Sequence, residues 1–135
     1  MAPIIQFGEN AGKVWEALNC KGPLSETKLL TTTLLDEREL QSAIGWLARE
    51  NKICKNGTVY KLGNTNLTPK IGMDAGKVWS ILTQKGETDV QTLARTARID
   101  VSEAFSALGW LAREEKIQVK VEDKQSRPQV KVALK

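Results

Sequence analysis

The chain of 135 residues is 41% hydrophobic and 27% charged, and its net charge of +4 makes it mildly basic. It has no histidine, which excludes a Ser-His triad and any zinc site that uses histidine, and it has no apolar run long enough to span a membrane. The N-terminal sequence MAPIIQFGEN lacks the basic and apolar segments of a signal peptide, and Cys20 and Cys54 lie in one half of the chain only. We therefore expect a cytoplasmic protein with free, reduced thiols.

The sequence contains an internal repeat. Residues 8–53 and 72–117 align without a gap, and about half of the paired positions are identical. Such a repeat indicates one structural unit present twice. We expect a first domain over 7–62, a linker over 63–70 and a second domain over 71–135. Each unit has about 60 residues, near the lower limit for independent folding, so we expect the two to pack together or to hold a restricted geometry.

A first helix is expected in each copy, after a short lead-in over residues 1–6. Asn10 and Asp74 can both cap a helix N-terminus, and the segments that follow, AGKVWEALN and AGKVWSILT, place apolar residues at helical spacing. A Lys-Gly pair ends each helix, as is usual at a helix C-terminus.

A second, shorter helix is expected next, over residues 25–32 of the first copy. In the second copy Thr88 and Gln91 have the spacing of a capping box for a helix that ends near Ala97.

The third helix carries the clearest signal. Residues 36–53, DERELQSAIGWLARENKI, and residues 100–117, DVSEAFSALGWLAREEKI, both begin with an aspartate followed three positions later by a glutamate, which predicts a capping box. Apolar residues then recur at helical spacing and form a stripe that faces the core. The opposite face is expected to point outward, and it holds Arg38, Gln41, Ser42, Gly45 and Arg49 in the first copy and Ser102, Phe105, Ser106, Gly109 and Arg113 in the second.

A β-hairpin is expected after each third helix. In the first copy Asn56-Gly57 separates two β-prone runs, which is a strong signal for a tight hairpin. In the second copy valines alternate over residues 117–121 and again over 130–134, with a polar loop expected over 122–128.

Three helices followed by a hairpin within about 60 residues resemble a winged helix-turn-helix domain. The segments AGKVWEAL and GWLARENKI are also similar to a family of short prokaryotic winged-helix proteins of unassigned function. The resemblance implies an α+β, mainly helical fold made of two tandem winged-helix domains. The fold alone leaves DNA reading, RNA binding and protein–protein contact open.

In the DNA-binding use of this fold, the third helix enters the major groove and the wing touches the backbone. The resemblance therefore implies a nucleic-acid-binding set from the third helices, the wings and the turn of the second copy: Arg38, Gln41, Ser42, Arg49, Lys55, Arg95, Arg98, Ser102, Ser106, Arg113, Lys120, Lys124, Arg127 and Lys131. Of the third-helix residues, Arg38 and Gln41 have the chemistry of base readers, and the second copy offers no comparable pair near its helix start.

The outward face of the third helices carries a second signal. Gly45 and Gly109 lie in mid-helix, where glycine costs on the order of 0.5–1 kcal/mol relative to alanine. With Trp46, Trp110 and Phe105 beside them, they predict a packing surface that joins the two units, forms a homodimer or binds a partner protein. The alternative is that the two tryptophans complete the core of each domain.

The sequence thus favours nucleic-acid binding, most of all to double-stranded DNA in a regulatory or architectural role, with RNA as another possible ligand. The alternative is an assembly module that uses the Ser-Gly-Trp face. We expect no enzymatic activity, cofactor, metal, small-molecule substrate or membrane partner, because no nucleophile lies beside a base and no glycine-rich phosphate loop is present.

Overall fold

The structure is a computed structural model that describes the backbone of residues 3–124 and 127–135 and the side chains of residues 4–121 and 129–135. The first half contains α1 (Pro3–Lys21), β1 (Leu24–Ser25), α2 (Glu26–Thr33), α3 (Glu37–Arg49), β2 (Ile53–Asn56) and β3 (Val59–Leu62). The second half contains a short π-helical turn, η1 (Thr68–Gly72), then α4 (Met73–Lys85), β4 (Thr88–Asp89), α5 (Val90–Ala97), α6 (Val101–Arg113), β5 (Ile117–Lys124) and β6 (Arg127–Leu134).

Each half has three helices and a three-stranded antiparallel sheet, with strand order β1-β3-β2 in the first and β4-β6-β5 in the second. The α+β, mainly helical class expected from the sequence is confirmed. The short strands β1 and β4 were not predicted, because two residues are too few to show the alternation that identifies a strand.

The third helices begin as predicted. In α3 the Glu39 amide donates to Asp36 Oδ1 at 2.8 Å, and the Asp36 amide donates to Glu39 Oε1 at 3.0 Å. In α6 the Asp100 amide donates to Glu103 Oε1 at 2.9 Å. Both capping boxes are therefore formed, and they fix where these helices start.

The first helices begin earlier than predicted. α1 starts at Pro3, so residues 3–6 are helical and Asn10 is a buried mid-helix residue instead of a cap. α4 follows η1 directly, and Asp74 lies inside it. The early start has a physical reason, because Ile4 and Phe7 pack against the core of the second half.

Two other local predictions are wrong. The cap of α5 is Asp89, whose Oδ1 accepts the Thr92 amide at 2.8 Å, and Thr88 lies in β4 instead of forming a capping box with Gln91. The polar loop expected over 122–128 is largely paired backbone, since the ladder of β5 and β6 continues to Lys124 opposite Arg127. Residues 125–126 of that loop lie outside the described residues.

The first sheet has a protected edge. Asn66 follows β3, and its side chain bonds the outer edge of β2 at Lys55. The Lys55 amide donates to Asn66 Oδ1 at 2.9 Å, and Asn66 Nδ2 donates to the Lys55 carbonyl at 2.7 Å. The Asn66 side-chain amide thus satisfies both backbone groups of Lys55, which a further strand could otherwise bond.

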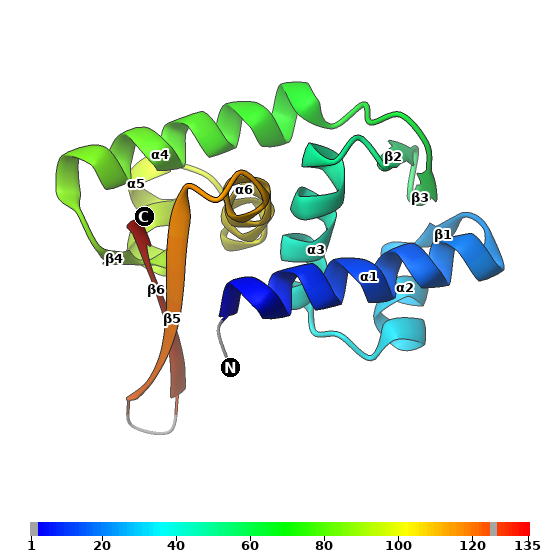
Figure 1. Cartoon of the computed structure of the whole chain (residues 1–135), viewed down its shortest axis with the longest axis horizontal. Helices are drawn as coiled ribbons and strands as arrows, with labels where there is room; N and C mark the ends of the chain where they lie inside the picture. The colour runs from blue at the N-terminus through cyan, green and yellow to red at the C-terminus, as the bar shows by residue number, and fades with distance from the viewer. Residues whose placement is uncertain (1–2, 125–126) are drawn as a thin grey trace.

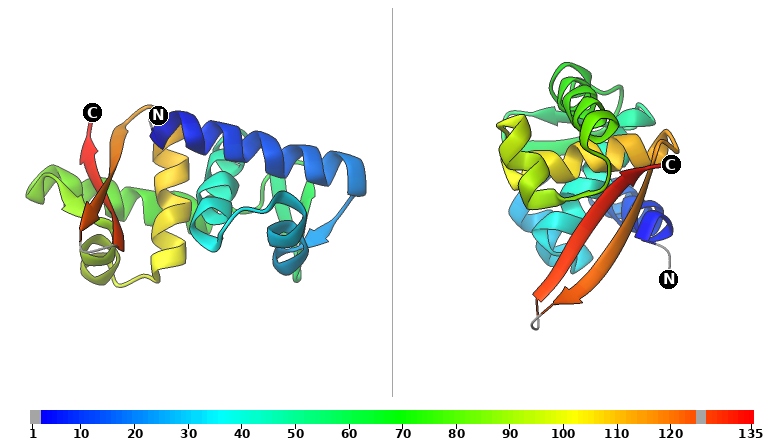
Figure 2. Two further views of the ribbon diagram at one scale, coloured as in Figure 1. Left: turned by 90° about the horizontal axis from the view of Figure 1, so that it is seen from below. Right: turned by 90° about the vertical axis from the view of Figure 1, so that its left-hand side faces the viewer.

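The two halves are interlocked about α3 and α6, which lie side by side at the centre of the molecule (Figures 1 and 2). Phe7, from the first half, belongs to the hydrophobic core of the second half, and Ile71, its repeat equivalent, belongs to the core of the first. The start of α1 and the turn η1 therefore each reach across to the core of the other half. The hairpin β5–β6 extends well beyond the helices (Figure 1).

Candidate nucleic-acid interface

The third helices meet at their glycines. A Cβ on Gly45 would lie 1.8 Å from the backbone oxygen of Ser106, and a Cβ on Gly109 would lie 1.9 Å from the backbone oxygen of Ser42. Both distances are far below any real contact, so only glycine permits this approach. The mid-helix glycines identified in the sequence therefore serve the contact between the two halves.

The prediction that this face points outward is wrong. Ser42 is 1% exposed, Phe105 4% and Ser106 6%, so none of them can face bases in this structure. Gln41 is bonded at both ends of its amide: its Oε1 accepts from Ser106 Oγ at 3.0 Å, and its Nε2 donates to Glu26 Oε1 at 3.0 Å. Ser102, at the start of α6, is half-buried. A helical wheel separates the core face from the opposite face, but it cannot tell solvent from a neighbouring copy.

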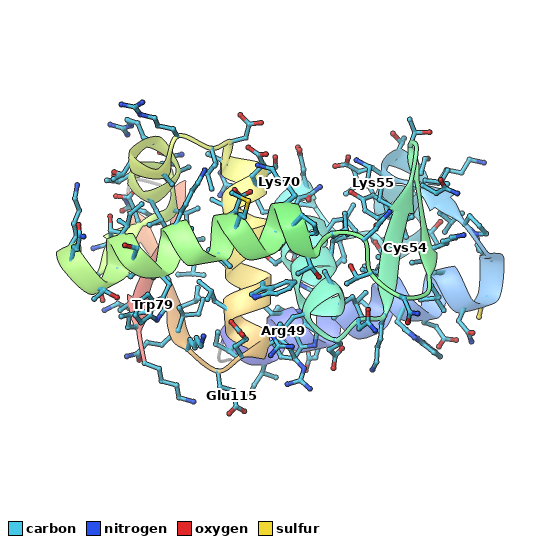
Figure 3. All side chains as sticks on the ribbon, turned by 90° about the horizontal axis from the view of Figure 1, so that it is seen from above. Arg49, Cys54, Lys55, Lys70, Trp79 and Glu115 are labelled. Atoms are coloured by element: carbon cyan, nitrogen blue, oxygen red, sulfur yellow. The ribbon has the colours of Figure 1, made fainter. Side chains whose placement is uncertain are left out.

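Two reciprocal ion pairs close the far end of the contact. Arg49 Nε lies 3.0 Å from Glu114 Oε2, and Arg113 Nε lies 2.9 Å from Glu50 Oε2. Figure 3 shows Arg49 where the ends of α3 and α6 meet. The two arginines, predicted to bind nucleic acid, are thus partly committed to joining the halves.

The tryptophans link the glycine contact to both cores. Trp46 and Trp110 are partly buried, and each packs against both hydrophobic clusters. The Arg113 guanidinium lies 5.8 Å above the Trp46 ring, and the Arg49 guanidinium lies 5.7 Å above the Trp110 ring. The aromatic rings therefore both complete the cores and support the contact between the halves.

Four further basic residues of the predicted set are exposed, but they are spread over the molecule. Arg38 lies at the start of α3 with its guanidinium 5.8 Å above the Phe105 ring, and Lys55 lies on the first wing above Tyr60. Arg95 and Arg98 are exposed at the end of α5.

The second wing gathers basic residues on one face. In the register of β5 and β6, Lys120 lies opposite Lys131 and Lys124 opposite Arg127. Lys120 and Lys131 fall on the face opposite the buried Val119 and Val132. Lys120 Nζ also lies 3.0 Å from Glu87 Oε2. The side chains of Lys124 and Arg127 lie outside the described residues.

An ion cluster that the sequence did not predict lies at the start of α4. Lys70 Nζ is 2.6 Å from Glu103 Oε2 and 2.9 Å from the buried Asp74 Oδ2. Figure 3 shows Lys70 at the start of α4, above α6. The only sequence signal for this cluster is the four-residue spacing of Lys70 and Asp74. From the sequence, Lys70 was instead expected in the linker and Asp74 at a helix cap.

This cluster shifts two pKa values in opposite directions. The hydrogen bond from Lys70, and then the Asp100 amide, lower the pKa of Glu103. The bonds to Glu103 and then Asp74 raise the pKa of Lys70. Both pKa shifts favour the charged forms, so the pair stabilises the fold where Lys70 and Glu103 are both ionised.

The free energy of unfolding is expected to reflect the cluster at acidic pH. A lowered pKa means that Glu103 contributes stability above the ordinary glutamate pKa of about 4.3 and loses it as the pH falls through the lowered value. Lys70→Gln should therefore be less stable than wild type near pH 7, and the gap should close in acid. Urea unfolding from pH 7 to pH 2.5 tests this, with Lys85→Gln as the control for loss of one charge. A gap that stayed constant with pH would contradict the prediction.

Among the described residues, no helix is long and apolar enough to cross a membrane, and no group of three or more cysteine or acidic side chains is placed to hold a metal.

Three helices and a β-hairpin wing, with the short strand before the second helix joined to the hairpin, define each half as a winged helix-turn-helix domain. The chain belongs to the family described as Winged helix-turn-helix domain (DUF2582), which matches it twice, over residues 3–63 and 64–129. The resemblance identified from the sequence is thereby confirmed. No curated protein matches the chain.

Proposed function

We propose that this protein binds double-stranded DNA through its phosphate backbone, in an architectural or regulatory role, with the β5–β6 wing as the main contact. The observation that carries this proposal is the pair Lys120 and Lys131, which lie opposite each other on the face of β5–β6 away from the buried valines, in a hairpin whose tip extends beyond the helices. Backbone contacts of this kind need positive charge and reach, and they carry no sequence information.

Winged helix-turn-helix domains generally bind nucleic acids, usually with the third helix in the major groove. Here the equivalent faces of α3 and α6 are buried against each other, and Gly45 and Gly109 leave no space between the two backbones. The proposal therefore assigns no base reading to Gln41, Ser42 or Ser106. That the protein is cytoplasmic and not an enzyme stays a prediction.

Wild type should bind a random 20-base-pair duplex with a dissociation constant in the range of about 10⁻⁴–10⁻⁶ M at physiological salt, the range usual for non-specific binding. Lys120→Gln/Lys131→Gln should weaken binding and reduce the slope of log affinity against log salt by about 0.9 for each phosphate that the variant no longer neutralises. Fluorescence anisotropy at several salt concentrations measures both quantities.

The matched control is Lys13→Gln/Lys28→Gln, which removes the same charge from exposed positions on α1 and α2. Equal weakening by both pairs would mean that net charge alone drives binding and would remove the wing from the proposal. Absence of binding at low salt would overturn DNA binding itself. The alternative of an assembly module would then gain weight, since an apolar contact has no comparable salt dependence.

A further inference from the structure

A groove of about 470 Å³ opens between the first half and the wing of the second. Its walls are the start of α1, the start of α3, Phe105 of α6 and the inner face of β5–β6. The apolar part is formed by Phe7, Phe105, Val119, Val121 and Val130, and Val121 remains 56% exposed. This size and this apolar lining are typical of small-molecule sites.

The groove contains a buried donor without a partner. Asn10 is 1% exposed, and its Oδ1 accepts a hydrogen bond from Gln6 Nε2 at 2.8 Å. Its Nδ2 is the only buried side-chain nitrogen or oxygen of the described residues that has no hydrogen-bond partner. Buried polar groups are nearly always paired, so a donor left open on the wall of a groove indicates a missing acceptor.

The second half of the chain shows which side chains can occupy the equivalent position without leaving a donor unpaired. The residues equivalent to Gln6, Asn10 and Glu39 are Lys70, Asp74 and Glu103, and in the second half these three form the closed ion cluster. The first half has Gln6 where the cluster has its lysine, and Asn10 where the cluster has its aspartate. The open donor is therefore specific to the first copy and not a consequence of the fold.

The charges around the groove indicate an uncharged ligand. Asp36 and Glu39 exchange backbone hydrogen bonds in the capping box of α3, and Arg38, the cation on this helix turn, lies over the Phe105 ring. Lys120 is a second cation on the lining, so two carboxylates and two cations border the groove, and their charges favour neither an anion nor a cation. We propose that the groove binds a small apolar molecule with one neutral carbonyl, whose oxygen accepts from Asn10 Nδ2 while its apolar body lies between the phenylalanines and the valines of the wing.

The proposal can be tested by NMR titration of the labelled protein with three probes of similar size. 4-Phenylbutan-2-one carries a neutral carbonyl, butylbenzene carries no acceptor, and 4-phenylbutanoate carries a charge. The ketone should shift resonances of Phe7, Asn10, Phe105 and Val121, and butylbenzene should bind at least about fivefold more weakly because it leaves the buried donor unpaired. The carboxylate should also bind more weakly than the ketone. Butylbenzene binding as tightly as the ketone, or a carboxylate binding more tightly, would overturn the assignment.

The repeat also supplies a matched pair of variants. Gln6→Lys/Asn10→Asp copies the ion cluster into the first half, where Glu39 already occupies the third position, and it should abolish ketone binding while thermal unfolding shows that the fold is retained. Lys70→Gln/Asp74→Asn makes the reverse change in the second half and should leave ketone binding unchanged. Ketone binding that survived the first change, or that both changes reduced equally, would refute a site at Asn10. These substitutions leave Lys120 and Lys131 in place, although Lys120 also borders the groove. DNA binding measured on the same variants therefore separates failure of this site from failure of the proposed function.

Discussion

Gly45→Ala and Gly109→Ala should each lower the free energy of unfolding by at least about 3 kcal/mol, at the upper end of what overpacking costs. Each added methyl would stand within 2 Å of a backbone oxygen on the opposite helix, and backbone, unlike a long side chain, cannot rotate away. The helices must therefore separate, which also strains the ion pairs of Arg49 and Arg113. Urea unfolding measures the loss.

The control is the same substitution at Gly12 and Gly76, which lie in α1 and α4 with open space where a Cβ would be. There alanine should stabilise the protein by up to about 1 kcal/mol, because glycine is the poorer helix former. A similar effect at all four glycines would show that helix propensity, and not the close approach of α3 and α6, determines the outcome.

Phe7→Ala should cost about 3–5 kcal/mol, the range for removing a buried aromatic side chain. The structure also predicts where the damage occurs. Phe7 belongs to the first half by sequence but packs in the core of the second, so amides of α4 and α6 should lose hydrogen-exchange protection first.

Ile5→Ala, on the same helix turn but with its side chain 58% exposed, is the control and should change stability by less than about 1 kcal/mol. If hydrogen-exchange protection in Phe7→Ala fell first in α2 and α3, this would contradict the assignment of Phe7 to the core of the second half.

The sequence was sufficient to predict the repeat, the third helices and the hairpins, because these depend on local signals such as Asp36 with Glu39 and the alternating valines of the second wing. The start of α1 was not predictable in this way. Asn10 has good capping chemistry, and its helix extends to Pro3 only because Ile4 and Phe7 have a core to enter in the other half. Tertiary packing overrode a correct local preference.

For the candidate site, too, local sequence signals were predictable and tertiary contacts were not. Gly45 and Gly109 indicate a close approach of two backbones, yet nothing local could show that the partner was the other copy of the same helix. Polar residues on an amphipathic helix usually face water, which is why Ser42 and Ser106 are predicted to meet nucleic acid, whereas here each serine lies beneath the opposing glycine. The Lys70 cluster was not predictable because it depends on Glu103, which is distant in sequence.

The reciprocal contacts of the two halves have the form of a twofold homodimer. Arg49 bonds Glu114 while Arg113 bonds Glu50, and each glycine meets the serine of the other copy. In such an isologous arrangement each surface is its own complement. The short connection after Leu62 makes the encounter intramolecular, equivalent to a local concentration in the millimolar range, so assembly does not depend on how much protein the cell contains. Covalent fusion also frees each copy from matching the other, and the wings of the two halves do differ, with strands of four residues in the first and eight in the second.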